Sequence, residues 1–181
     1  MSKTKKNNLP SDSLGRTKKM VLTGLLFAIA LVLSLVENSL PQLAIPVPGV
    51  KLGLSNIAVM YTLFFVGAGQ AFSIAVLKAL FVLLTRGTVA ALLSLLGGLL
   101  SVAIMLVLLF IFKEKISYLI ISIAGSVFHN VGQFIGISFI YTSMGLWAYL
   151  PVLLIAGIIA GIATSTLLRF ILPAFKKLGL K

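Results

Sequence analysis

Apolar runs cover most of the chain, and short polar or turn-forming stretches separate them. A helix that crosses the hydrocarbon core of a bilayer needs roughly 20 mostly apolar residues. The stretch 116–168 has no formal charge and would extend roughly 80 Å as one helix, so we expect it to turn back at 142–145. The pattern predicts an all-α integral membrane protein with six transmembrane helices, of which the second is the shortest: 19–37, 55–66, 70–85, 88–112, 116–141 and 146–172.

The composition and the placement of the charges support this prediction. The chain is 60% hydrophobic and only 10% charged, whereas soluble domains average about 25% charged residues. Most Lys and Arg residues precede the first span, follow the last one or lie in the hinge at 113–115. Six spans place both termini on one side of the membrane, and the positive-inside rule makes that side the cytoplasm. The net charge of +12 therefore indicates anchors at the membrane surface rather than binding to nucleic acid.

The chain divides into a membrane domain with two basic ends. Residues 1–18 form a basic cytoplasmic segment, 19–172 form the six-helix domain, and 173–181 form a basic cytoplasmic tail. The first apolar run is long and lacks a clear cleavage site, so we expect a retained helix rather than a signal peptide. The loop 41–53 lies on the outer side, where its prolines and apolar side chains suit a lid over a site. We expect a multi-pass protein of the plasma membrane.

Three cations depart from the pattern of surface anchors, namely Lys51, Lys78 and Arg86. Lys78 lies near the middle of the third span, and a charge within a bilayer usually faces a cavity or the bundle interior. Either it extends to the membrane surface or pairs with Glu37 for structural reasons, or it lines a ligand cavity. We prefer the cavity, because most strongly polar groups near the membrane gather in the same, outer half.

A stripe of polar residues runs along the fifth span, at spacings that place it on one helix face. Its members are Ser122, Ser126, His129 and Gln133, and Asn130 lies beside them. A lone His on a helix is most often a satisfied core residue, but a His within a polar stripe in hydrocarbon favours a cavity lining. A proton relay through His129 is the weaker alternative, because no carboxylate lies within its span.

These observations predict a ligand pocket that opens to the outside. Three cations face one carboxylate there, so an anionic ligand, or one rich in hydrogen-bond acceptors, would suit the pocket. The predicted substrate-binding residues are Lys51, Asn56, Lys78, Arg86, His129, Asn130 and Gln133.

Several kinds of chemistry lack their residues in this sequence. The chain has no Cys and no G-x-x-x-x-G-K-[ST] loop, and its three acidic residues, Asp12, Glu37 and Glu114, are far apart. A carboxylate cluster that could hold Mg²⁺ and a diphosphate is therefore missing. We expect no catalytic residue, no metal site and no cofactor, and hence a protein that is not an enzyme.

Three motifs resemble those of one membrane family. They are the run Pro48-Gly-Val-Lys-Leu-Gly-Leu-Ser-Asn56, the Leu96-Gly-Gly98 step and the pattern His129-Asn-x-x-Gln133. The family is the Gx transporter family, also called heptaprenyl diphosphate synthase component I. It looks like the substrate-binding S component of energy-coupling factor (ECF) transporters, and the resemblance covers about residues 20–172.

The resemblance implies an ECF S-component-like bundle that captures a small vitamin- or isoprenoid-like molecule on the outer side. A transmembrane coupling subunit and two ATPase subunits would then drive its release inside. In S components small residues of the first helix meet the coupling subunit, and Gly24 and Ala28 are the corresponding positions here. The enzyme name implies an alternative, a membrane accessory component of heptaprenyl diphosphate synthesis. A small stand-alone permease, which would contact its substrate and membrane lipid, is the third hypothesis.

Overall fold

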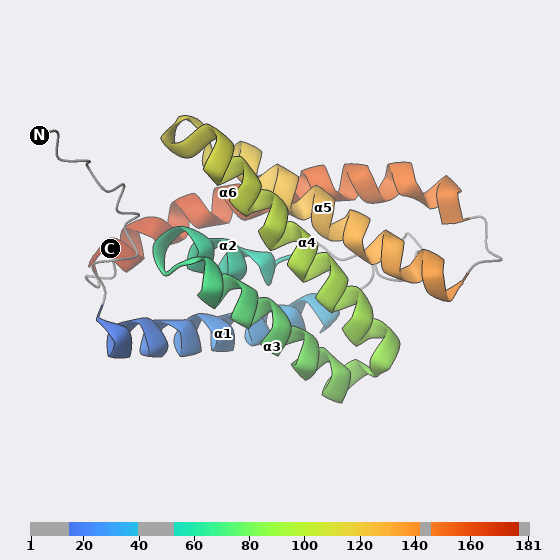
Figure 1. Ribbon diagram of the computed structural model, residues 1–181, viewed down its shortest axis with the longest axis horizontal. Helices are drawn as coiled ribbons and strands as arrows, with labels where there is room; N and C mark the ends of the chain where they lie inside the picture. Colours follow the sequence, from blue (N-terminus) through green and yellow to red (C-terminus); the bar gives the residue numbers. More distant parts are fainter. Residues whose placement is uncertain (1–14, 40–52, 142–145, 178–181) are drawn as a thin grey trace, which may run out of the picture.

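The computed structural model describes residues 15–39, 53–141 and 146–177, which are almost entirely helical (Figure 1). No strand occurs in these ranges, so the predicted all-α class is confirmed for them. The predicted turn at 142–145 lies outside the described residues, and so do 1–14 and 40–52, which hold Lys51 and most of the predicted outer loop. The elements in chain order are α1 (Arg16–Ser39), α2 (Asn56–Phe65), α3 (Ala68–Arg86), α4 (Thr88–Phe112), η2 (Lys113–Lys115), α5 (Tyr118–Ile140), η3 (Leu146–Tyr149) and α6 (Leu150–Lys177).

Five helical segments within the described ranges are long and apolar enough to cross a membrane. They are Arg16–Glu37, Ala68–Arg86, Thr88–Phe112, Tyr118–Ile140 and Trp147–Phe170. In contrast, α2 has only 10 residues, which corresponds to about 15 Å, half of a typical hydrocarbon core. Five of the predicted spans therefore reach the length of a transmembrane helix, and the second one is a short helix.

The short helix α2 lies in the middle of the bundle and contacts α1, α3, α4 and α6. Every residue from Asn56 to Leu63 is buried. A helix that is apolar on all sides is stable where other helices surround it, and the main core cluster joins Tyr61 of α2 to Leu26 of α1 and Ile74 of α3. The burial of α2 carries its first residue, Asn56, into the interior.

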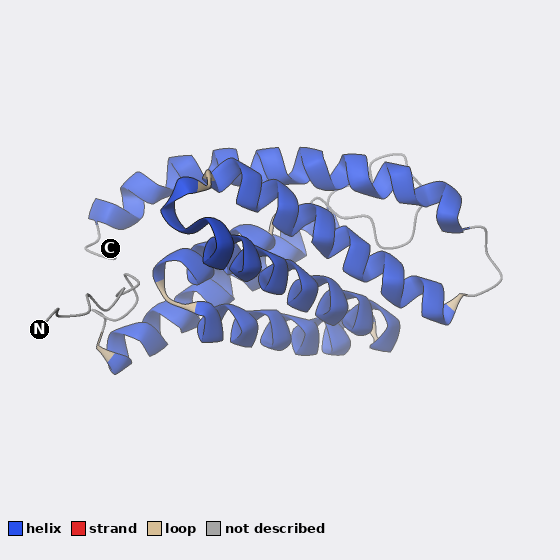
Figure 2. Cartoon of the chain, turned by 45° about the horizontal axis from the view of Figure 1, so that its top comes forward, coloured by secondary structure: helices blue, strands red, loops and turns tan. Residues whose placement is uncertain are grey.

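The outward side chains of the long helices are apolar as well. Phe110 of α4, Phe139 of α5 and Phe170 of α6 are all more than 75% exposed. Such large apolar surfaces are unfavourable in water and favourable in lipid. Figure 2 shows these helices lying side by side, with the start of α1 and the end of α6 at the same end of the bundle. The fold is that of a multi-pass helical membrane protein.

The Gly97–Gly98 step allows α4 to pack closely between α3 and α5. A Cβ added to Gly98 would lie 3.3 Å from the Cβ of Ala75 in α3. A Cβ added to Gly97 would lie 2.9 Å from the Nδ1 atom of His129, and one added to Gly132 would lie 2.8 Å from the Cα atom of Gly97. Larger side chains at these positions would push the helices apart. The small residues of α4 therefore allow both α3 and α5 to pack closely against it.

Candidate ligand-binding site around Lys78

The side chain of Lys78, near the middle of α3, turns into the bundle. It is only 5% exposed, and its Nζ atom donates a hydrogen bond of 2.8 Å to the Oγ atom of Ser55. Lys78 therefore does not extend to the membrane surface. An ammonium group has three N–H donors, and a buried charge is stable only where a counter-charge or other polar groups surround it.

Glu37, at the end of α1, supplies the counter-charge. Its carboxylate interacts electrostatically with Lys78 and Arg86, and its Oε1 atom accepts a 2.5 Å hydrogen bond from the backbone N–H of Gly53. Gly53 has a φ of +73°, and a Cβ there would lie 3.1 Å from the Nδ2 atom of Asn56, so this position favours glycine. Glu37 thus ties the end of α1 to the residues that begin α2.

Asn56 stands at the first position of α2, where the backbone makes a tight turn. Its N–H donates a 2.8 Å hydrogen bond to the carbonyl of Gly53. Its side-chain Nδ2 atom is buried and has no hydrogen-bond partner among the described residues. Leaving a buried amide unpaired costs about 1–3 kcal/mol, so this N–H group is a donor that a ligand would satisfy.

His129 and Gln133 of α5 form a buried pair one helical turn apart. The Nε2 atom of His129 and the Nε2 atom of Gln133 are 3.1 Å apart. Gln133 Oε1 lacks a hydrogen-bond partner in the part of the chain that the structure describes, and His129 Nδ1 lies against Gly97 of α4. His129 also interacts electrostatically with Lys78. The polar groups of α5 and α3 therefore belong to one interior cluster, which we call the Lys78 cluster and which consists of Glu37, Ser55, Asn56, Lys78, His129 and Gln133.

Two other polar residues of α5 bind α6 instead. Asn130 donates a 2.9 Å hydrogen bond from Nδ2 to the carbonyl of Leu153, and Ser122 donates one of 2.8 Å from Oγ to the carbonyl of Gly161. A Cβ on Gly161 would collide with the backbone of Ile123, so glycine allows this close approach. These side chains hold α5 against α6, as is common for polar residues between helices in membranes.

The structure thus brings together four of the predicted binding residues, namely Asn56, Lys78, His129 and Gln133. Arg86 is exposed at the end of α3 and is linked to the cluster by its electrostatic interaction with Glu37. Asn130 faces α6, and Lys51 lies outside the described residues.

Sequence reasoning missed Ser55 as a member of the cluster. A Ser directly before a helix predicts an N-cap, but Ser55 makes no side-chain cap hydrogen bond, and its Oγ atom accepts a hydrogen bond from Lys78 instead. The one signal was its place in the Pro48–Asn56 motif beside Asn56.

The chemistry of the Lys78 cluster suits acceptor atoms on a ligand. An ammonium, a side-chain amide and an imidazole offer N–H groups, and charge-assisted hydrogen bonds to anionic oxygens are the strong ones. No group of three or more His, Asp or Glu side chains that could hold a metal ion occurs among the described residues. The cluster offers hydrogen-bond donors to acceptor atoms and, in the described ranges, no recognisable set of metal ligands.

The apolar helices and the buried polar centre define a helical membrane protein with an interior polar site. Residues 26–171 match the model of the family described as heptaprenyl diphosphate synthase component I, and the chain belongs to that family. The match confirms the resemblance drawn from the sequence motifs, and the word component fits a protein that works with a partner. No curated protein and no solved structure matches the chain.

Proposed function

We propose that this chain is a non-catalytic membrane component that binds a small anionic molecule of the isoprenoid type at the Lys78 cluster. The observation that carries the proposal is the buried ammonium of Lys78 in a cluster with two buried polar atoms that lack partners among the described residues: Asn56 Nδ2 and Gln133 Oε1. In this proposal the termini are cytoplasmic, the protein lies in the plasma membrane, and the short helix α2 stands for the second of six crossings. The Lys78 cluster then opens to the outer side.

The charge and surroundings of the cluster support an anionic, partly apolar ligand. Two basic side chains, Lys78 and Arg86, stand against one acidic side chain, Glu37. Glu37 already accepts a hydrogen bond from Gly53, so a second anion would find the cations less than fully neutralised. The core around α2 is apolar, with Tyr61 at its centre. An isoprenyl diphosphate combines a multiply charged head, which Lys78 and Arg86 would bind, with a hydrocarbon chain that suits the apolar helices of the bundle.

The family description favours a role in heptaprenyl diphosphate synthesis. The chain has only three acidic residues, which stand singly in the sequence, and it has no Asp-rich motif of the kind that holds Mg²⁺ for a prenyl condensation. Catalysis would therefore belong to a separate soluble subunit. In this role the chain holds an isoprenyl diphosphate at the membrane and presents it to that subunit.

A second candidate function is the S component of an ECF importer. The open face of α1 favours it, because Gly24 and Ala28 are both exposed and a Cβ on Gly24 would meet nothing within 4 Å. Small residues one helical turn apart allow a second transmembrane helix to approach closely. A coupling subunit would dock there, and two ATPase subunits would supply the energy for release of the ligand inside.

Ligand identification tests the binding proposal. The full chain is purified in mild detergent, and small molecules are extracted and identified by mass spectrometry. We expect an isoprenyl diphosphate to accompany the native protein and to be absent from Lys78→Ala. Lys113→Ala is the matched control, because Lys113 is exposed on η2, and it should retain the molecule. Equal recovery from the native chain, Lys78→Ala and Arg86→Ala would overturn the proposal.

The partner decides between the two roles. With the full chain as bait, capture of a soluble prenyl synthase with Asp-rich motifs supports the accessory role. Capture of a membrane coupling subunit with its ATPases, lost in Gly24→Leu, supports the importer. Uptake that does not depend on ATP and is lost in His129→Ala would instead indicate a stand-alone permease.

A further inference from the structure

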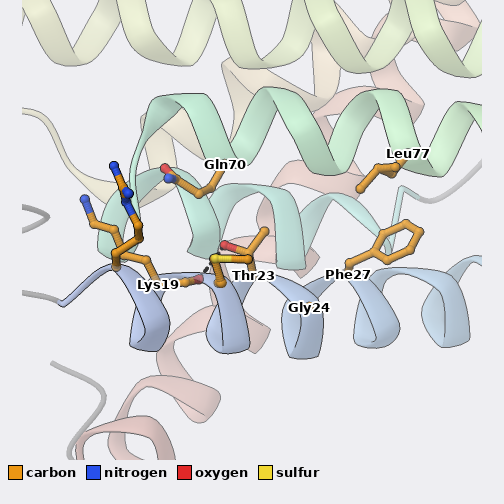
Figure 3. A pocket seen from close by; sticks show the side chains of 8 residues that line it. Lys19, Thr23, Gly24, Phe27, Gln70 and Leu77 are labelled. Carbon is orange, nitrogen blue, oxygen red and sulfur yellow. Dashed lines mark hydrogen bonds between the residues drawn. The ribbon is translucent and has the colours of Figure 1, made fainter.

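A groove with a volume of about 590 Å³ runs between α1 and α3, on the outside of the bundle and apart from the Lys78 cluster. Its two ends differ in chemistry (Figure 3). Arg16, Lys19 and Gln70 line one end, and Phe27 and Leu77 line the other. The groove therefore has a cationic, polar end and an apolar end, which is the complement of an amphiphile with an anionic head.

The direction of the groove agrees with the direction of a lipid in a bilayer. Arg16 begins α1 at the end of the bundle where α6 ends (Figure 1), and the apolar span of α1 starts there. From Arg16 to Phe27 the helix rises by about 16 Å, close to the roughly 15 Å of one leaflet of a hydrocarbon core. The cations thus lie at the depth of headgroups, and Phe27 and Leu77 lie at the depth of acyl chains.

We propose that this groove is a binding site for one anionic phospholipid of the leaflet on the side of the chain ends. The phosphate group lies between Arg16 and Lys19, the amide of Gln70 donates a hydrogen bond to it, and an acyl chain follows the groove past Gly24 to Phe27 and Leu77. Basic pockets between transmembrane helices bind anionic headgroups in this way. The site is separate from the interior Lys78 cluster, and it shares Gly24 with the face of α1 that the second candidate function assigns to a coupling subunit.

A phospholipid fits this groove better than a prenyl diphosphate does. The groove is open to the surrounding bilayer. Exposed apolar side chains lie beside it on both helices, Leu25 on α1 and Val76 on α3, so acyl chains enter it from the side without leaving the membrane.

Gly24 provides a variant that blocks the groove without disturbing the protein. It lines the groove, and a Cβ built on it would meet no atom within 4 Å. The side chain in Gly24→Leu therefore enters the space of the proposed acyl chain. Lys113 and Lys115 provide the charge control, because they are exposed and do not line the groove.

The experiment is native mass spectrometry of the full chain with phosphatidylglycerol or phosphatidylcholine that carry the same acyl chains. We expect the native chain to bind one phosphatidylglycerol at least about tenfold more tightly than phosphatidylcholine. Arg16→Gln/Lys19→Gln should lose this preference, Gly24→Leu should bind neither lipid at this site, and Lys113→Gln/Lys115→Gln should behave as the native chain does.

Three results would overturn the proposal. One is an equal loss of preference in the two double variants, since it would indicate a general effect of charge. Another is unchanged lipid binding in Gly24→Leu. The third is displacement of phosphatidylglycerol by farnesyl diphosphate at equimolar concentration, which would make the groove a prenyl diphosphate site. Lys78→Ala should leave lipid binding intact, so a failure here is distinguishable from a failure of the interior ligand site.

Discussion

Glycine has opposite consequences in the two halves of this bundle. Between α4, α5 and α6, added Cβ atoms at Gly97, Gly132 and Gly161 would all collide with a neighbouring helix. On α1, an added Cβ at Gly24 would meet nothing within 4 Å, and neighbouring apolar side chains such as Val21 are exposed. In the packed half, formed by α4, α5 and α6, the glycines allow neighbouring helices to approach closely. In the open half, formed by the outward face of α1, the small residues remain accessible to lipid or to a partner.

The largest loss of stability is expected from a bulky side chain at a glycine between α4 and α5. Gly132→Leu places a branched side chain against the backbone of Leu96 and Gly97, where even a Cβ would lie within 2.9 Å of three atoms. We expect a loss of about 3 kcal/mol or more in the free energy of unfolding, because the helices must separate. Unfolding by sodium dodecyl sulfate in mixed micelles, followed by circular dichroism, measures it. A native-like transition would show that α4 and α5 are not packed as described.

A smaller loss is expected at the turn before α2. Gly53→Ala forces an L side chain into a φ of +73° and brings its Cβ to 3.1 Å from Asn56 Nδ2. Such strain costs on the order of 1–3 kcal/mol. It also displaces the backbone N–H of residue 53, which donates a hydrogen bond to the carboxylate of Glu37. The same unfolding assay should give a lower midpoint, and Glu37→Gln should lower it as well. If Gly53→Ala matched the native chain, the tie between α1 and α2 would be absent.

Substitutions at two neighbouring residues of α5 should have different effects, one on the stability of the fold and the other on ligand binding. Asn130→Ala removes the hydrogen bond to the carbonyl of Leu153 and should lower the free energy of unfolding by about 1 kcal/mol, with ligand affinity of the folded protein unchanged. His129→Ala should weaken ligand binding by about tenfold or more, because one charge-assisted or neutral hydrogen bond to the ligand is lost. Ligand titrations monitored by thermal shift check both. The reverse pattern would place the ligand between α5 and α6.

The smallest effect on stability is expected in the open half. Gly24→Ala should raise the free energy of unfolding by no more than about 1 kcal/mol, since it adds a methyl group to empty space and alanine favours the helix. Its effect should appear in lipid or partner binding. A large loss of stability in the isolated chain would mean that α1 packs against the bundle at this position.

The sequence predicted the helical class, the long spans and the interior position of Lys78, because each follows from local composition. It also predicted the short second helix, 55–66 against the observed Asn56–Phe65, but not the burial of α2, since a run of about 12 apolar residues is compatible with a tilted span or a central helix. The sequence also placed Ser122 and His129 on one polar stripe that was expected to line a cavity. In the structure, α5 lies between α4 and α6. Ser122 therefore binds α6, and His129 packs against Gly97 of α4. Which neighbour a polar side chain meets depends on helix packing, which a single sequence does not show.

The central claim is that buried cationic and amide groups around Lys78 bind an anionic isoprenoid. The most direct measurement is the affinity of the full chain for farnesyl diphosphate, with farnesol as the uncharged control, by thermal shift in native protein, Lys78→Ala and Lys113→Ala. The account predicts that farnesyl diphosphate stabilises the native protein and Lys113→Ala, that farnesol does not, and that Lys78→Ala binds at least about tenfold more weakly. Equal affinity of native protein and Lys78→Ala, or no stabilisation of the native protein at all, would contradict it.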